Sequence, residues 1–242
     1  MVRIFNILIG FLFPGKCRAC GVLIRGASNP YICPVCWSAL RFPEGKLCSR
    51  CGAELGGRGG ESQVCDPCGA GENLFDKGLW VCGYNEAMRS AIHTLKYERK
   101  SRMARFLSEL MVSSIGEFMD EAKAEVLLPV PIHRKKLRER EFNQAGLLAE
   151  GIGKVYNIPV VEGCLVRDRE TPPQSQLDRE GRRSNVRGAF RVADAKKVSG
   201  KSVMLVDDIY TTGATVNECC RVLIEAGVRS VYVLTLARPV VP

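Results

Sequence analysis

The sequence of 242 residues predicts an α/β fold, a parallel sheet flanked by helices, preceded by a small cysteine-rich domain. The runs 126–131, 203–206 and 230–237 are short and apolar without strict alternation, as expected for strands buried on both faces of a sheet. Stretches with helical spacing separate them, as in βαβ units. Four C-x-x-C pairs occupy the beginning of the chain. We therefore expect two units, residues 1–72 and residues 73–242.

Within residues 73–242, each expected element follows from the spacing of its apolar residues. The first strand alternates in side-chain character, and the two stretches after it carry apolar residues along one helical stripe. Gly227 is the stop signal of the last helix. The expected strands are 77–84, 126–131, 160–166, 189–192, 203–206 and 230–237, and the expected helices are 86–97, 102–119, 142–156 and 216–226.

The stretch from Asp207 to Thr215 is the most informative part of the chain. Two carboxylates stand where the strand 203–206 is expected to end, and a turn of threonines and one glycine precedes a helix. Ligands of open α/β sheets bind at the carboxyl ends of strands, and a helix N-terminus offers N–H groups to a phosphate. An ordinary strand–turn–helix with capping residues explains one Asp and one Thr, but not both acids with Thr-Thr-Gly-x-Thr. We expect Asp207 and Asp208 to face sugar hydroxyls or a metal bound to them. The expected phosphate-binding residues are Thr211, Thr212, Gly213, Ala214 and Thr215.

Eight of the twelve cysteines form four C-x-x-C pairs, and the first two pairs recur after 31 or 32 residues as an internal repeat. Four thiolates per repeat fit a closed tetrahedral zinc site, which is structural because no coordination position stays open. Pairing within each repeat is favoured over an interleaved arrangement, and redox pairs are the weaker alternative. The expected zinc ligands are Cys17, Cys20, Cys33, Cys36, Cys48, Cys51, Cys65 and Cys68. The other four cysteines, expected to be buried apolar residues, are Cys82, Cys164, Cys219 and Cys220.

A second anion site is expected after the strand 126–131, where two prolines flank Val130. Proline fixes φ and removes N–H donors where the chain has to turn. Because the basic run 133–140 starts at the carboxyl end of a strand, we favour a pyrophosphate site over a solvated basic helix. The residues expected there are Val130, Pro131, Ile132, His133 and Arg134. Lys96, near the end of the helix 86–97, fits either a phosphate contact or a complement to the helix dipole.

The formal charge of +9 indicates an anionic partner, although eight thiolates (−8) with two zinc ions (+4) would lower it to +5. That charge fits phosphate-rich ligands and does not by itself indicate nucleic-acid binding. The apolar run 4–13 is far shorter than the ~20 residues that span a bilayer, and we expect a short docked helix there. The sequence predicts a cytoplasmic protein with reduced cysteines.

Taken together, these motifs resemble the ComF family along nearly the whole chain. Residues 203–215 resemble the phosphoribosyl-pyrophosphate (PRPP) motif of type I phosphoribosyltransferases. The other motifs in the family order are Leu95-Lys96-Tyr97, Pro129-Val130-Pro131, Arg140-Glu141-Phe142-Asn143-Gln144-Ala145, Thr171-Pro172-Pro173-Gln174 and residues 183–190. One departure is Glu141, which stands where the family usually has Gly. The resemblance implies a type I phosphoribosyltransferase-like sheet after a double zinc ribbon.

The resemblance also implies which residues contact each part of the ligand. Residues 207–215 would hold the ribose and 5′-phosphate of Mg²⁺-PRPP, and residues 130–133 would lie at the pyrophosphate. The polar residues 167–187 would form a mobile loop, because the cation-like anomeric carbon has to be shielded from water while pyrophosphate leaves. The loop residues expected to matter are Arg167, Gln174, Arg183, Asn185 and Arg187.

The ComF family is linked to DNA uptake in natural competence. The resemblance therefore implies two kinds of function. The first is pentosyl transfer from PRPP to an unknown acceptor, with weak or no transfer to free nucleobases because no segment resembles a base-recognising hood. The second is a module without turnover that senses PRPP or a nucleotide, while its zinc ribbons and basic loops bind single-stranded DNA or a DNA-uptake helicase.

Overall fold

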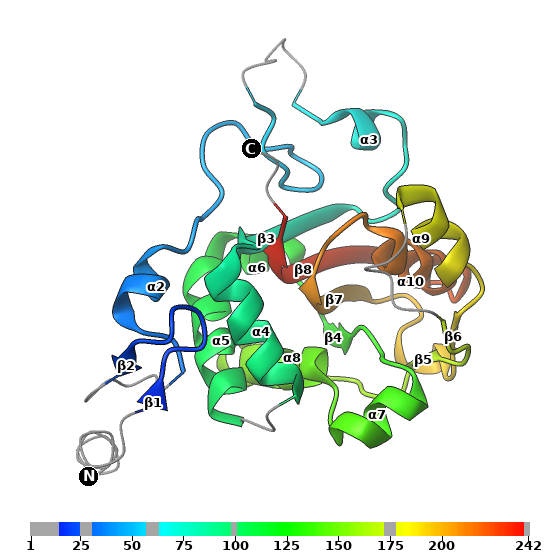
Figure 1. The fold of residues 1–242 in the computed structure, drawn as a ribbon. Coiled ribbons are helices and arrows are strands. Elements are labelled where there is room, and N and C mark those ends of the chain that lie inside the picture. The colour runs from blue at the N-terminus through cyan, green and yellow to red at the C-terminus, as the bar shows by residue number, and fades with distance from the viewer. Residues whose placement is uncertain (1–14, 25–30, 57–62, 98–100, 172–177, 240–242) are drawn as a thin grey trace.

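The computed structural model describes residues 15–24, 31–56, 63–97, 101–171 and 178–239, and the expected N-terminal helix lies outside these residues. Four parallel strands form the central sheet in the order β3-β8-β7-β4 (Figure 1). They are β3 (Lys77–Gly83), β4 (Val126–Pro129), β7 (Ser202–Ile209) and β8 (Ser230–Arg238). The predicted α/β class with a parallel sheet is confirmed.

Both faces of this sheet are buried, as the continuous apolar runs predict. Val203 and Leu205 of β7 point into one core while Met204 and Val206 point into the other, and all four are fully buried. Burying an aliphatic side chain of this size is worth about 1.5–3 kcal/mol, so the central strand is held firmly from two sides. Its carboxyl end is therefore a rigid platform for side chains.

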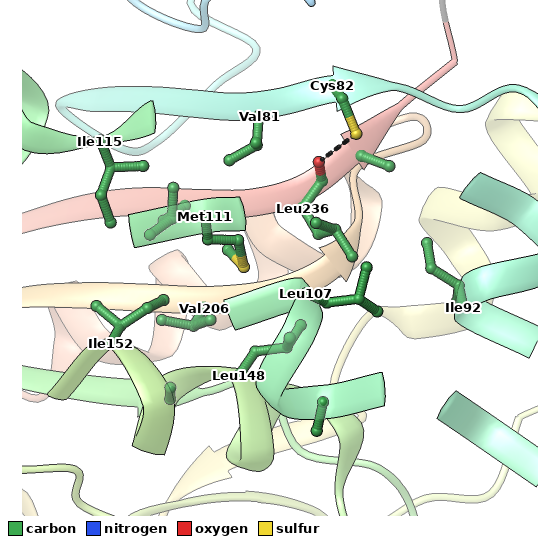
Figure 2. Packing of buried hydrophobic residues seen from close by; sticks show 14 of the residues in the cluster. Val81, Cys82, Ile92, Leu107, Met111, Ile115, Leu148, Ile152, Val206 and Leu236 are labelled. Atoms are coloured by element: carbon green, nitrogen blue, oxygen red, sulfur yellow. Dashed lines mark hydrogen bonds between the residues drawn. The ribbon is translucent and has the colours of Figure 1, made fainter. Parts of the chain in front are cut away.

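Helices cover the Met204 face of the sheet. They are α4 (Glu86–Tyr97), α5 (Ser101–Ser114), α6 (Gly116–Ala122) and α8 (Gln144–Tyr156). Figure 2 shows Leu107 and Met111 of α5, with Leu148 and Ile152 of α8, packed close to Val206. The thiol of Cys82 donates to the carbonyl of Leu236 at 3.4 Å. Cys82, Cys164, Cys219 and Cys220 are fully buried, as expected.

The Val203 face is covered by α10 (Ala214–Glu225) and by a separate two-stranded antiparallel sheet of β5 (Leu165–Arg167) and β6 (Phe190–Val192). This arrangement corrects the expected strand 160–166. Val160 makes only an isolated bridge to Leu127, and the chain then turns through Gly163, at φ 70°, before β5 begins. A positive φ is a conformation that glycine adopts without steric cost, so the strand is interrupted there.

The two cysteine repeats lie against opposite faces of the sheet. The first holds the hairpin β1 (Gly15–Lys16)–β2 (Leu23–Ile24) and α2 (Pro34–Ser38), and its Trp37 packs on Phe106 of α5 with ring centroids 4.1 Å apart. The second holds α3 (Asp66–Gly69), and its buried cysteines join the core on the α10 face. The linker between the repeats and the start of the second repeat cover the outer edge of β3, where Gly83 N–H donates to Arg41 O at 2.6 Å and Gly78 N–H to Arg50 O at 2.7 Å.

Four further elements differ from the expected ones. The helix 102–119 is two helices, α5 and α6, separated at fully buried Ile115, whose φ of −117° is not helical. The strand β7 continues through both acids to Ile209. The basic run forms α7 (Arg134–Arg140), and part of the expected loop 167–187 forms α9 (Arg179–Val186). Among the described residues, the structure contains no helix with both the length and the apolar character that crossing a bilayer requires.

Candidate phosphoribosyl and zinc sites

A cavity of about 390 Å³ opens at the carboxyl edge of the sheet, beyond the ends of β4 and β7. Segments far apart in the sequence meet there, because parallel strands place their carboxyl ends on the same side. Its lining residues are Tyr84, Lys96, Val130, Pro131, Ile132, Lys136, Arg140, Gln144, Arg167, Arg182, Asp207, Asp208, Ile209, Thr211 and Thr215.

Asp207 and Asp208 both line this cavity, and their environments differ. The Asp208 carboxylate is buried and paired with the Lys96 ammonium. Burial alone would raise the pKa of Asp208, but the charge and hydrogen bond of Lys96 bring it below its usual value. Burial and the neighbouring Asp208 charge raise the pKa of Asp207 well above its usual range. The two carboxyl groups therefore differ in acidity, and Asp208, which is paired with Lys96, is the more acidic of the two.

The turn after β7 places Thr211 and Thr215 at the same cavity. Gly213 begins α10 with φ 77°, and a Cβ on it would lie 2.3 Å from Tyr210 Oη, so only glycine fits. The Thr212 hydroxyl is buried and makes no hydrogen bond to the described residues. A buried unpaired hydroxyl is unfavourable, which favours an external partner for this group. The first N–H groups of α10 lack helical partners and add donors at the same point.

The expected pyrophosphate residues divide between two places. The backbone of Val130 is anchored, since its N–H donates to Val206 O at 2.9 Å and its carbonyl accepts from Asn143 Nδ2 at 3.0 Å. Pro131 and Ile132 line the cavity with it. His133 instead caps α7 through Nδ1, and Arg134 lines a neighbouring cavity of about 450 Å³.

Four basic residues face the 390 Å³ cavity together with Lys96. They are Lys136, Arg140, Arg167 and Arg182, of which only Arg167 was expected at the ligand. Arg140 donates to Gln144 Oε1 at 3.1 Å and to Tyr97 Oη at 3.2 Å, which fixes its guanidinium. The signal in the sequence is the i, i+4 spacing of Lys136 and Arg140, which puts both on one face of α7.

Burial and crowding lower the pKa of two of these cations. Burial and the nearby charges of Arg167 and Arg140 lower the pKa of Lys136. Burial also lowers the pKa of Arg167, whose Nε is buried without a hydrogen-bond partner in the described residues. An anion between these groups would relieve both effects. The cavity is therefore acidic on the β7 side and basic on the α7 side.

The expected mobile-loop residues are spread over the surface around the cavity. Arg167 lines it from β5, whereas Arg183 pairs with Glu72 on the outside of α9. The backbone carbonyls of Asn185 and Arg187 accept from Arg169 at 3.0 and 2.7 Å. Gln174 lies outside the described residues. Within α9, Arg182 is the residue that reaches the cavity.

The backbone conformation of Glu141 shows why the ComF family usually has Gly at this position. It ends α7 with φ 68°, in the left-handed region, and its N–H donates to Leu137 O at 2.7 Å. A left-handed residue at a helix end is most often glycine because a Cβ is strained there. The turn keeps the glycine geometry with a glutamate in place.

The cysteines assemble in sequential fours: Cys17, Cys20, Cys33 and Cys36, and then Cys48, Cys51, Cys65 and Cys68. Within each group all sulfurs lie within 4.8 Å of one another, and Cys20 Sγ is 3.7 Å from Cys33 Sγ. A tetrahedron with Zn–S bonds of about 2.3 Å has edges of about 3.8 Å, so the groups fit two zinc ions. Bound zinc would staple the loops of each repeat and supply folding energy to them.

The comparisons with known proteins agree with a chain that combines two cysteine groups with a parallel α/β sheet. Residues 8–69 match the model of the double zinc ribbon domain, and residues 156–239 match the model of the phosphoribosyl transferase domain. "Competence protein F" of Haemophilus influenzae is 29% identical over 231 residues, 93% of this chain and 98% of that protein. "Competence protein ComFC" of Bacillus subtilis is 27% identical, covering 88% and 97%. "DNA utilization protein YhgH" of Escherichia coli K12 is 28% identical, covering 93% and 97%.

The fold and the site thus define a protein with a double zinc ribbon and a phosphoribosyltransferase domain. Its relatives along most of the chain confirm the resemblance to the ComF family. Among solved structures, the allosteric regulatory enzyme of purine biosynthesis is 24% identical, covering 55% of this chain and 25% of that one, with a TM-score of 0.35. The purine phosphoribosyltransferase of Pyrococcus horikoshii is 14% identical, covering 55% and 83%, with a TM-score of 0.34.

Proposed function

We propose that the chain binds Mg²⁺-PRPP in the 390 Å³ cavity and acts in DNA uptake. The observation that carries the proposal is that both acids of β7, the threonine turn and the basic face of α7 line one cavity. PRPP has the matching chemistry: a monophosphate, a diol and a pyrophosphate on one sugar. The names of the relatives as competence and DNA utilization proteins support the biological role.

In this proposal the 5′-phosphate occupies the turn 211–215. The N–H groups at the start of α10 donate to the phosphate, and a phosphate oxygen gives the buried Thr212 hydroxyl its partner. Gly213 keeps the turn open because its missing Cβ leaves room for Tyr210. The helix dipole adds a favourable interaction with the negative charge.

The ribose lies against Asp207 and Asp208. Both side chains can accept hydrogen bonds from the 2′- and 3′-hydroxyls, and the Asp208 carboxylate lies on the same side of the sugar as the anomeric carbon in this arrangement. Positive charge that develops on that carbon as pyrophosphate leaves is stabilised by a fixed carboxylate. Lys96 holds Asp208 ionised and in place for this purpose.

The pyrophosphate lies toward Val130–Ile132 and the cations of α7. Lys136, Arg140 and Arg167 compensate its charge, and bound Mg²⁺ shares this role when it arrives with the substrate. Transfer would break the bond from the anomeric carbon to the pyrophosphate oxygen, with the electron pair leaving on pyrophosphate. An acceptor nucleophile then bonds to that carbon.

A binding module for single-stranded DNA is a second candidate, favoured by a specific observation. A larger cavity of about 710 Å³ adjoins the first and shares Tyr84 and Lys96 with it. Arg18, Arg89 and Tyr97 line it, and Tyr97 is 60% exposed. Cations beside exposed aromatic rings are what stacking of unpaired bases requires.

Calorimetric titration with Mg²⁺-PRPP tests the proposal, and filter binding of single-stranded DNA separates the two candidates. In the double variant Asp207→Ala/Asp208→Ala, PRPP affinity should fall at least about tenfold, the equivalent of one or two charged hydrogen bonds. The matched control is Glu117→Ala/Asp120→Ala, which removes two exposed acids from α6. Pyrophosphate release that needs both β7 acids supports transfer, with little stimulation by free nucleobases. DNA affinity that survives loss of these acids but falls steeply with salt supports the module. Wild-type protein that does not bind PRPP refutes the proposal.

A further inference from the structure

Asn73 connects the second cysteine group to the threonine turn. It is a buried polar residue with 5% of its surface exposed. Its Nδ2 donates to Cys68 Sγ at 3.1 Å, while its Oδ1 accepts from Tyr210 Oη at 3.0 Å and from Asn217 Nδ2 at 3.3 Å. A buried amide whose donor and acceptor ends are both used can adopt only one orientation. Asn73 therefore joins Cys68, an expected zinc ligand, to the Tyr210 hydroxyl through two hydrogen bonds.

Tyr210 is the residue that sets the shape of the turn. It follows β7 directly, is 7% exposed, and its hydroxyl fills the space where Gly213 lacks a Cβ. Arg238 stacks on its ring at 4.7 Å and also donates to the carbonyl of Cys51 at 3.1 Å. Tyr210 thus touches two side chains that are each bound to a cysteine of the second group.

The helix that begins at this turn is held by the same segment of chain. Asn217 lies in the first turns of α10, and its Nδ2 donates to Glu72 O at 2.9 Å. Its Oδ1 accepts from Leu74 N–H at 3.1 Å. Residues 72–74 leave the second repeat only a few positions after Cys68 and pass the start of α10 on the way to β3 (Figure 1). Both ends of the phosphate turn are therefore tied to this repeat.

The first cysteine group has a different neighbourhood. Ile32 and Leu40 belong to the core on the α4 and α5 side, and Trp37 packs on Phe106. These contacts lie on the opposite face of the sheet from α10. The first repeat thus provides an internal control for effects that pass through the second.

We propose that Asn73 and Tyr210 are positioning residues, through which the second zinc site sets the geometry of the phosphate turn. The inference rests on the proposed binding of PRPP phosphate by that turn. Zinc fixes the Cys68 thiolate, the thiolate orients Asn73, and Asn73 holds the Tyr210 hydroxyl beside Gly213. Because coupling between sites is reciprocal, phosphate bound at the turn also stabilises zinc in the second site, but not in the first.

The first test removes one zinc at a time and needs no ligand. Cys68→Ser and Cys36→Ser should each lower the zinc content from two ions per chain to one. Amide hydrogen exchange of the peptide covering residues 210–217 should then accelerate in Cys68→Ser and stay unchanged in Cys36→Ser. Equal exchange rates in the two variants would overturn the inference.

The second test leaves all cysteines intact. Tyr210→Phe removes only the hydroxyl that meets Asn73, and should weaken Mg²⁺-PRPP binding about fivefold, the effect of one hydrogen bond, with two zinc ions retained. Tyr156→Phe is the matched control, because its hydroxyl contacts Val112 O at 3.5 Å, far from the turn. PRPP should slow chelator-driven release of one zinc from wild-type protein and from Tyr156→Phe, but not from Tyr210→Phe.

The outcomes separate the two claims. Wild-type affinity in Tyr210→Phe, or equal PRPP protection of zinc in both Tyr variants, overturns the link while the proposed function stands. A wild-type protein that does not bind PRPP refutes the proposed function, and the exchange comparison between Cys68→Ser and Cys36→Ser still decides whether the second zinc site shapes the turn.

Discussion

Lys96 and Asp208 form an ion pair at the base of the cavity, joining the end of α4 to the carboxyl end of β7. The side chains are only 19% and 7% exposed, so neither charge is well solvated. If one partner were removed, water would therefore solvate the remaining charge poorly. The pair keeps one carboxylate of the β7 acids ionised where a ribose is proposed to bind.

Loss of Lys96 should be costly for this reason. In Lys96→Met the unpaired Asp208 should lower the free energy of unfolding by about 3 kcal/mol or more near neutral pH. Urea unfolding measures this loss of free energy. Lys77→Met is the control, because the exposed Lys77–Glu121 pair should contribute at most about 1 kcal/mol.

The stabilising effect of the pair should depend on pH. The lowered pKa of Asp208 means that its charge stabilises the fold above the pKa of about 3.9 that Asp has in the unfolded chain. This stabilisation is lost as the pH falls through the lower pKa of the folded state. The difference between wild type and Lys96→Met should therefore shrink in acid. An equal effect of both substitutions would contradict this.

Gly213→Ala should eliminate PRPP binding with a modest loss of stability. The added methyl would lie 2.3 Å from Tyr210 Oη, and the alanine backbone would have to keep φ 77°. Gly200→Ala is a matched control, since Gly200 has φ 73° but open space around its Cβ position. Both variants should lose about 1–2 kcal/mol from the left-handed backbone, and only Gly213→Ala should lose the calorimetric signal of PRPP. Full affinity in Gly213→Ala would show that the turn does not carry the phosphate.

Binding of PRPP should be accompanied by proton uptake in alkaline solution. Burial and neighbouring cations lower the pKa of Lys136 in the unliganded cavity. A bound pyrophosphate would raise that pKa again, so in the range just below the usual Lys value of about 10.4 the free protein has to take up a proton to bind. Titrations in buffers of different ionisation enthalpy measure the uptake, which should increase with pH and vanish in Lys136→Met. Proton release at these pH values would exclude Lys136 from the anion site.

Some features were readable from sequence because local patterns determine them. The run Val203–Val206 has no polar position, so a strand with two buried faces was the only good placement. The cysteine repeat predicted both groups of four, because spacing within a repeat limits which sulfurs can meet. The two acids and the threonine turn are close in sequence, and Asp207, Asp208, Thr211 and Thr215 line one cavity, whereas Thr212, Gly213 and Ala214 are not among its lining residues.

Other features depend on packing between distant segments. The i, i+4 spacing of Lys136 and Arg140 places both on one face of α7, but the direction in which that face points depends on the angle at which α7 leaves the sheet. The partner of Asp208 comes from another helix, and Asn73 is an isolated residue in a connecting segment. Neither carries a local signature.

The structure of the chain in complex with Mg²⁺-PRPP is the most direct measurement of the central claim. We expect the 5′-phosphate within hydrogen-bond distance of the backbone amides of residues 211–215, with the ribose hydroxyls at Asp207 and Asp208. Saturating PRPP that leaves this turn empty, or that lies elsewhere on the molecule, would contradict the account.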